Sequence, residues 1–410
     1  MKNSDIDGGV SARPLSKKVR LHYLDWLRVL LILAVFLYHA ASPFRPAALP
    51  EWHIRNAEGS EVVMAIMLLA NPWVLPLFFL VAGAASRFAL RRRSNRQYIR
   101  ERVSRLLIPL IVGSILLTPI QAYLEALNEG TFQGSFLSYI PAMLARKASN
   151  TLFSPSAFGI WGYHLWFLGF LFGHSLLALP LFRWFKRDAG QSFISWLGRL
   201  VEKRGGILVL VIPLAVARVV VQPFVPIEEH GWLDFVYFFL FFVYGYIIYS
   251  DARFLEAVRR DRWLLFAGGL VGLVAYFAIT MAYGDVVIEW FQAFVMPWTI
   301  ILILTFALMS WGWALDVLYL VMKHLKRSNR WLEYGNDTLM PFYVLHQPVI
   351  IVIAYFVVQW NAGVGVKLLV IAFSSFLATL GLVELLVRPF EPMRRVFGMK
   401  SRRPKKVTGE

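Results

Sequence analysis

The sequence consists largely of apolar blocks, each of about twenty residues, separated by short polar segments. A helix of that length crosses the hydrocarbon core of a bilayer. Hydrophobic residues make up 58% of the 410 residues and charged residues 16%, and the apolar residues form runs rather than amphipathic stripes. The chain is therefore predicted to be all-α, a polytopic membrane helix bundle.

About ten transmembrane helices account for these blocks. We expect them at 24–42, 62–85, 105–124, 161–182, 207–224, 232–250, 263–282, 290–311, 338–358 and 365–386. Residues 24–386 would form the membrane domain, between basic tails at 1–23 and 387–410. The segment 312–330 is apolar and then basic, which suggests a separate interfacial helix on the cytoplasmic side.

The formal net charge is +17, and most Lys and Arg residues lie in alternate loops. The loop 86–105 alone carries eight Arg. The positive-inside rule then places both termini in the cytoplasm and favours membrane lipids over nucleic acid as the partner of these charges. The basic residues left in or beside the opposite loops are Arg45, Arg55, Arg146, Lys147 and Lys367.

There is no Cys, which excludes a thiolate nucleophile, a thiolate metal site and disulfide bonds. No metal site and no permanently bound cofactor are predicted. The first apolar block follows a polar, basic stretch and leads into further spans, so we interpret it as a signal anchor.

The first span carries three residues that are costly in a membrane: Asp25, Arg28 and His39. Asp25 and Arg28 are three residues apart and can pair. His39 lies about three turns beyond Arg28, roughly 16 Å along the axis, and within about 20° of the same face. This stripe is predicted to face the bundle interior or a cavity crossing most of the bilayer. The alternative is an interfacial ion pair with Arg28 snorkelling and His39 bonded to a neighbour.

The stretch "RLHYLDWLRVLLILAVFLYHA" (20–40) resembles the first span of the acyltransferase family 3 membrane proteins, in which an Arg is followed by ten residues and a His. Further segments match the family in order. They are "LPLFFLVAGAASRFALRRR" (75–93), "RERVSRLLIPL" (100–110), "GYHLWFLGFLF" (162–172), "LMPFYVLHQPVII" (339–351) and "LVELLVRPFEPMRRVFG" (382–398). The His-Leu-Trp-Phe-Leu and His-Gln-Pro strings are most similar to the subgroup of glucans biosynthesis protein C.

This resemblance implies an enzyme, an acyl-CoA dependent O-acyltransferase of the bacterial cytoplasmic (inner) membrane. It would move an acetyl or succinyl group from cytoplasmic acyl-CoA, as donor substrate, to a hydroxyl of a periplasmic glucan or another extracytoplasmic or lipid-linked oligosaccharide or polysaccharide. Glycan synthesis proteins are possible partners. A proton-coupled secondary transporter and a catalytically silent partner of a glycan synthase are the alternatives, because intramembrane ionisable residues occur in transporters as well.

The resemblance makes His39 the catalytic residue, with Arg28 and Asp25 beside it. Imidazole suits the removal of a hydroxyl proton near neutral pH, and acylation of its nitrogen is the other possibility. No Gly-x-Ser-x-Gly elbow supports a serine triad. Arg102 and Arg105 match the family's Arg-x-x-Arg motif and are expected to bind the CoA phosphates; otherwise they are topology charges.

Four more residues are candidates for the site. His164, Trp166 and His346 match family motifs and are expected to position acceptor or donor. Alternatively, His164 and Trp166 belong to an interfacial belt, and His346 satisfies backbone groups freed by Pro348. Glu384 is expected to form a structural pair, with Arg28 or Arg105 as the proposed partner.

Overall fold

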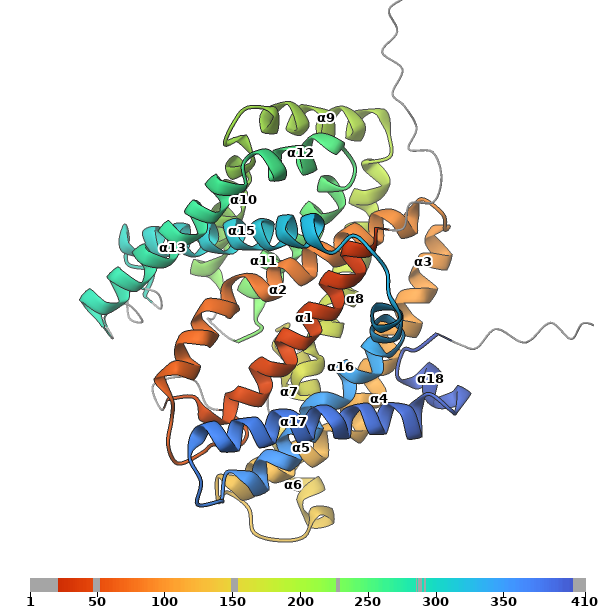
Figure 1. The fold of residues 1–410 in the computed structure, drawn as a ribbon, viewed down its shortest axis with the longest axis vertical. Coiled ribbons are helices and arrows are strands. Elements are labelled where there is room, and N and C mark those ends of the chain that lie inside the picture. The colour runs from red at the N-terminus through yellow and green to blue at the C-terminus, as the bar shows by residue number, and fades with distance from the viewer. Residues whose placement is uncertain are drawn as a thin grey trace, which may run out of the picture.

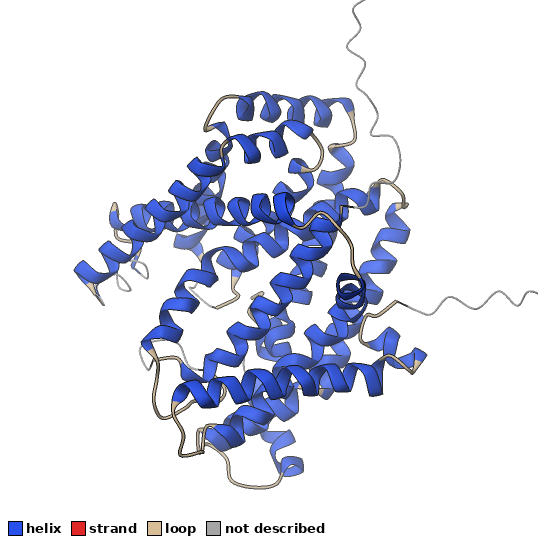
Figure 2. Ribbon diagram, in the orientation of Figure 1, coloured by secondary structure: helices blue, strands red, loops and turns tan. Residues whose placement is uncertain are grey.

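The computed structural model describes residues 21–46, 52–148, 154–225, 229–284, 286, 290 and 293–400. Helices and their connecting loops make up all of these residues, with no strand among them (Figures 1 and 2). The predicted all-α class is confirmed. Residues 1–20 of the first tail and 401–410 of the second lie outside the described residues. The side of the membrane on which the termini lie stays a prediction.

Among the described residues, eight helices are long and apolar enough to cross a membrane, or up to ten if each of two bent pairs counts as one span. This range includes the predicted number of spans. The bent pairs are Asn95–Leu116 with Thr118–Asn128, at 43°, and Trp232–Ile248 with Ala252–Arg260, at 105°. The longer helices are α1 (His22–Ala41), α2 (Glu61–Leu90), α8 (Trp166–Trp184), α11 (Trp232–Ile248), α13 (Arg262–Tyr283), α15 (Trp298–His324), α16 (Arg330–Val357) and α17 (Val364–Leu382). The shorter ones are α3 (Asn95–Arg102), α4 (Ile108–Leu116), α5 (Thr118–Asn128), α6 (Phe136–Ala148), α7 (Ala157–Gly162), α9 (Asp188–Glu202), α10 (Val211–Val221), α12 (Ala252–Arg260) and α18 (Glu391–Val396).

Helix α15 corrects the prediction of a separate interfacial helix at 312–330. Residues 312–324 continue α15, which begins at Trp298 and not at 290. Because the helix starts later than predicted, its apolar part extends further along the sequence. Leu315 and Leu318 in this part are fully buried. The helix ends with Lys323 and His324 in its last turn, where cations favour the helix dipole.

Helices α2 and α11 approach each other so closely that their contact requires glycine. A Cβ atom on Gly83 would lie 1.8 Å from the carbonyl oxygen of Phe242, and one on Gly245 would lie 1.9 Å from that of Leu80. Real Cβ atoms do not come this near to backbone oxygens. Small residues therefore let these two helices pack backbone to backbone, as is common in membranes.

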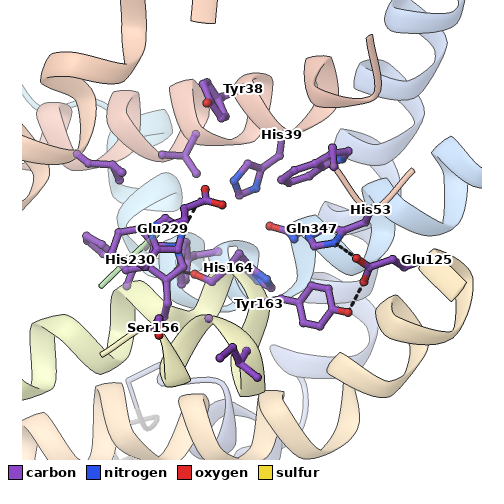
Figure 3. Close-up of a pocket in the computed structure, with 18 of the residues that line it drawn as sticks. Tyr38, His39, His53, Glu125, Ser156, Tyr163, His164, Glu229, His230 and Gln347 are labelled. Carbon is purple, nitrogen blue, oxygen red and sulfur yellow. Dashed lines mark hydrogen bonds and ion pairs between the residues drawn. The ribbon is translucent and has the colours of Figure 1, made fainter. Parts of the chain in front are cut away.

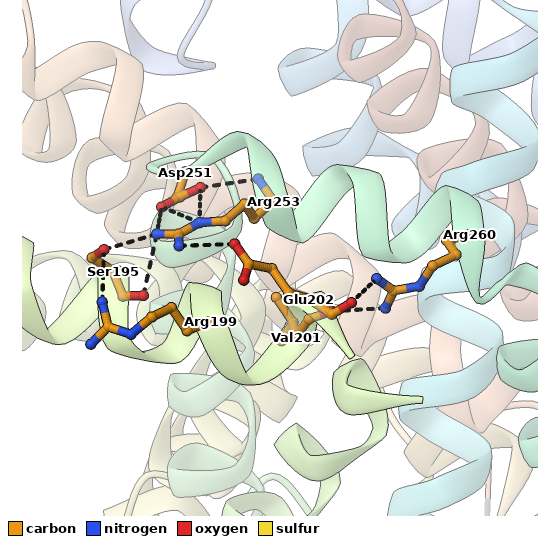
Figure 4. A network of polar contacts seen from close by, with 7 residues as sticks. All are labelled: Ser195, Arg199, Val201, Glu202, Asp251, Arg253 and Arg260. Atoms are coloured by element: carbon orange, nitrogen blue, oxygen red, sulfur yellow. Dashed lines mark hydrogen bonds and ion pairs between the residues drawn. The ribbon is translucent and has the colours of Figure 1, made fainter. Parts of the chain in front are cut away.

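At one end of the bundle α9 and α12 lie side by side, joined by a polar network (Figures 1 and 4). Arg253 binds Asp251 at 2.6 Å and Glu202 at 3.2 Å. Arg260 donates to the carbonyl oxygen of Val201 at 2.8 Å. These contacts hold α12 across the end of the bundle after the bend that follows α11.

Candidate active site

A cavity of about 470 Å³ lies beside the C-terminal half of α1 (Figure 3). Its lining comes from α1, α2, the segment that follows α1, α5 to α8, residues 229–230 and α16. The polar and aromatic lining residues include Tyr38, His39, Arg45, Trp52, His53, Glu125, Lys147, Tyr163, His164, Trp166, Glu229, His230 and Gln347.

Three histidines that are far apart in the sequence meet beside this cavity, and two of them, His39 and His164, line it. The ring of His39 lies nearly parallel to that of His346, with centroids 5.1 Å apart and planes 7° from each other. His164 stands edge-on to both, 6.4 Å from His39 and 5.1 Å from His346. Helix α1, the 3-10 turn η3 (Tyr163–Leu165) and α16 each supply one ring. The predicted candidates His39, His164 and His346 therefore lie together; their roles remain predictions.

The hydrogen bonds fix where the hydrogens lie on the pair His39–His346. The Nδ1 atom of His346 faces the carbonyl oxygen of Tyr343, which can only accept, so this Nδ1 carries a hydrogen. In neutral His346 the Nε2 atom is then an acceptor, and it lies 3.1 Å from Nδ1 of His39. His39 must donate from Nδ1, which leaves the lone pair of its Nε2 atom available at the cavity.

His164 is tied to α16 in both directions. Its Nε2–H donates to the carbonyl oxygen of Val344 at 3.1 Å, and its own carbonyl accepts from the hydroxyl of Tyr343. The Nδ1 atom is buried and has no hydrogen-bond partner among the described residues. His164 thus offers a fixed, unused acceptor next to His39, able to bind a hydroxyl group of a ligand.

A second polar cluster, formed by His53, Glu125 and Tyr163, also lines the cavity. Nδ1 of His53 is 3.2 Å from Oε1 of Glu125, and the Tyr163 hydroxyl donates to the other oxygen of that carboxylate (Figure 3). The ammonium group of Lys147 lies 5.1 Å from the centre of the Tyr163 ring. This cluster joins three separate segments of the chain: the loop after α1, α5 and η3.

Trp166, a predicted positioning residue, stacks on His230 with ring centroids 3.8 Å apart. Burial lowers the pKa of His230 from its ordinary value, while Glu229 and Asp234 act to raise it. His230 and Tyr163 both have positive φ, 58° and 53°. Such backbone strain in non-glycine residues is concentrated at functional sites, and both residues line this cavity.

The remaining predicted residues lie elsewhere. Asp25 and Arg28 approach to 3.9 Å, but neither lines the cavity, which takes only His39 from the predicted stripe. Arg102 donates to the Ser86 hydroxyl at 3.1 Å, and Arg105 lies in a π-helical turn, both away from the cavity lining.

Glu384 binds Arg388 at 2.9 Å, one helical turn away. Its ion-pair partner is therefore not Arg28 or Arg105. The expected partner was wrong because the i,i+4 spacing brings Arg388 to Glu384 on their own helical segment.

Several residues at the cavity were not predicted, although the charge pattern contained a signal for two of them, Arg45 and Lys147. Arg45, Lys147 and Lys367 are among the few basic residues that the charge rule leaves on the outer side. Arg45 and Lys147 line the cavity. Lys367 binds the side chain of Asn56 at 2.8 Å and thereby holds the segment that carries Trp52 and His53. Some of the basic residues on the predicted outer side therefore lie at or next to this site.

Although three imidazoles meet, within the described ranges no group of three or more His, Asp or Glu side chains is arranged to hold a metal ion. One nitrogen of His346 is hydrogen-bonded to the carbonyl oxygen of Tyr343, and one nitrogen of His164 to that of Val344. The cluster is suited to hydrogen bonding and proton transfer.

Comparison with known proteins gives two matches. A family model described as an acyltransferase domain matches residues 21–388. The chain is also similar to "Glucans biosynthesis protein C" of Salmonella heidelberg (strain SL476), with 23% identity over 276 residues, which covers 65% of this chain and 67% of that protein. No solved structure matches.

Proposed function

This chain belongs to the acyltransferase family 3 membrane proteins, and from that premise we propose that it moves an acyl group from acyl-CoA to a hydroxyl of an extracytoplasmic or lipid-linked glycan. The setting proposed is a bacterial inner membrane, with donor and acceptor on opposite faces. Because it belongs to this family, acyl transfer is favoured over the alternative of a proton-coupled transporter.

The observation that carries the proposal is the hydrogen-bonded pair His39–His346 at the cavity. The contact of 3.1 Å between their nitrogens leaves Nε2 of His39 as a free base. An imidazole held in one tautomer by a second group is the arrangement that general-base catalysis requires.

In the proposed reaction, a glycan hydroxyl gives its proton to Nε2 of His39 while its oxygen attacks the thioester carbonyl carbon. A C–O ester bond forms, the C–S bond breaks, and the proton passes from His39 to the leaving CoA sulfur. His346 accepts from Nδ1–H of His39 throughout, so the imidazolium ion stays oriented. The acceptor nitrogen of His164 would hold the attacking hydroxyl group or a neighbouring one.

The glycan part of the proposal rests on two supports. The relative is named for glucan biosynthesis. Aromatic rings of Trp52, Trp166 and Tyr163 also line the cavity, and rings of this kind present flat apolar faces on which sugars can pack. Arg102 and Arg105 are proposed to hold the CoA phosphates through their donor forks.

The test uses the full-length protein purified in nanodiscs with acetyl-CoA or succinyl-CoA and a glucan acceptor. We expect release of CoA and an ester-linked product detected by mass spectrometry. His39→Ala should reduce transfer by about 100-fold or more. His324→Ala is the matched control, because His324 is exposed at the end of α15 and away from the cavity.

Two results would contradict the proposal. Full transfer by the His39→Ala protein would remove the catalytic assignment. Absence of any acyl product together with proton-coupled uptake into vesicles would favour the transporter.

A further inference from the structure

Arg45 lies where the chain leaves α1, and it faces the same cavity as His39. One terminal nitrogen donates to the Tyr38 hydroxyl at 2.6 Å. The guanidinium carbon lies 5.3 Å from the centre of the Tyr38 ring and 5.6 Å from that of Trp52. These contacts hold the guanidinium plane in one place at the cavity wall.

The positive charge of Arg45 has no carboxylate partner among the described residues. No Asp or Glu oxygen of the described chain comes within ion-pair distance of this guanidinium, and its Nε–H is buried without a hydrogen-bond partner. A guanidinium carries five N–H donors, and burying one of them unpaired is costly. A site with spare donors and an uncompensated charge is prepared for an anion.

The two carboxylates among the residues that line the cavity are placed differently. Glu125 is engaged by His53 and Tyr163. Glu229 has its side chain 74% exposed and lies 3.5 Å from His230. An anion that enters the cavity would therefore find Arg45 ready to bind it.

Trp52 links this charge to the reacting centre. Its ring centroid lies 5.3 Å from that of His39, and the guanidinium carbon of Arg45 lies 5.6 Å from its centre. Arg45 and His39 thus both border the same indole ring, which keeps the distance between them short. That separation fits a short substrate with a reacting carbonyl or hydroxyl at one end and a negative charge at the other.

We propose that Arg45 is a specificity-determining residue that binds a carboxylate carried by one of the two substrates. This inference rests on the proposed acyl transfer and narrows it. The carboxylate has two possible sources: the far end of a dicarboxylic acyl group, or an acidic sugar of the acceptor. A planar guanidinium binds either through paired N–H donors.

The experiment compares Arg45→Gln and Arg45→Lys with the wild type in nanodiscs. Transfer is measured with succinyl-CoA and acetyl-CoA, each with a neutral glucan and with an oligosaccharide containing glucuronic acid. Arg45→Gln should lower kcat/KM for the charged substrate by about 10- to 100-fold and change the fully neutral pair by less than about threefold. Arg45→Lys should recover part of the loss, because it keeps the charge without the fork.

The pattern of loss identifies the source. A loss restricted to succinyl-CoA assigns the carboxylate to the acyl group, and a loss restricted to the acidic oligosaccharide assigns it to the acceptor. An equal loss for all four pairs, or no loss for any, would overturn the inference.

A binding measurement separates this inference from the proposed function. Succinate, but not the neutral succinamide, should raise the thermal unfolding temperature of the wild type and leave that of Arg45→Gln unchanged. If no acyl transfer occurs at all but this difference is seen, the anion site stands and the proposed reaction fails. If both compounds act alike on both proteins, the anion site is wrong.

Discussion

The imidazole of His39 lies parallel to that of His346, and Nδ1 of the first is 3.1 Å from Nε2 of the second. The two residues are 307 positions apart in the chain. His346 in turn gives its own Nδ1–H to the carbonyl of Tyr343. A backbone carbonyl thus sets the tautomer of one ring, and that ring sets the tautomer of the next.

These two hydrogen bonds predict that activity depends on a hydrogen-bond acceptor at position 346 more than on an imidazole ring there. His346→Leu should lower kcat by about 100-fold, because His39 can then turn or take the wrong tautomer. His346→Gln should retain about tenfold more activity than His346→Leu, since its carbonyl oxygen can accept from Nδ1–H of His39. Steady-state kinetics against pH measure both. Equal activity of the two variants would contradict this expectation.

The burial of His230 leads us to expect that the folded protein becomes less stable at acidic pH. Burial lowers the pKa of His230 in the folded protein, so below about pH 6.5 the unfolded chain binds this proton more readily than the folded one. Stability should therefore fall as the pH drops through 6.5 toward the folded pKa. His230→Asn keeps a residue that tolerates positive φ and removes the titration. Its unfolding temperature should depend less steeply on pH over this range; an unchanged slope would count against the assignment.

The contact between α2 and α11 predicts a large effect of a single methyl group. Gly83→Ala places a Cβ atom against the carbonyl oxygen of Phe242 and should cost about 1–3 kcal/mol of stability, or more. Gly365→Ala is the matched control, because nothing lies within 4 Å of its added Cβ atom. Thermal unfolding in the same detergent compares the two, and similar losses would contradict the packing described.

Lys367 predicts a coupling between α17 and the segment that carries Trp52. Its ammonium group donates to the Asn56 side chain at 2.8 Å and to the carbonyl of Val358 at 2.9 Å. Lys367→Met and Asn56→Leu should each cost about 1–3 kcal/mol and lower transfer activity. The loss of stability in the double variant should differ from the sum of the two single losses by at least about 0.5 kcal/mol. Simple additivity would show that the two side chains act independently.

The arginines of the loop 86–105 should differ from one another. Arg102→Gln is expected to raise KM for acyl-CoA by about tenfold and to leave KM for the glycan unchanged. Arg96→Gln is the control, since Arg96 is exposed on the same helix, α3. Initial rates with each substrate varied in turn distinguish the two. An equal effect of both variants would indicate that these arginines only set the membrane topology and do not bind acyl-CoA.

Much of the fold followed from the sequence because a bilayer permits few solutions. Each apolar block has to become a helix, since unpaired backbone groups are too costly in hydrocarbon. The error at 312–330 has a related cause. Hydropathy marks where a helix is apolar but not where it starts, so the late start of α15 at Trp298 was missed.

The site was only partly accessible from the sequence. His39 could be selected as an ionisable residue in an apolar span, and His164 and His346 because they match motifs of the family. The hydrogen bond between His39 and His346 could not be foreseen, because helix periodicity describes the faces of one helix and not its neighbours. His53 lies in a loop, Glu125 in α5 and Tyr163 in η3, and their meeting depends on how these segments pack.

The three imidazoles come from the first, middle and last thirds of the chain, which has a consequence for synthesis. Until α16 has been inserted beside α1 and η3, His39 in the nascent chain lacks the acceptor on His346 that sets its tautomer. If His39 is the base of the proposed acyl transfer, a partly made protein would therefore leave cellular thioesters intact. The proposed reaction would become possible only when assembly is nearly finished, so activity would indicate correct membrane insertion.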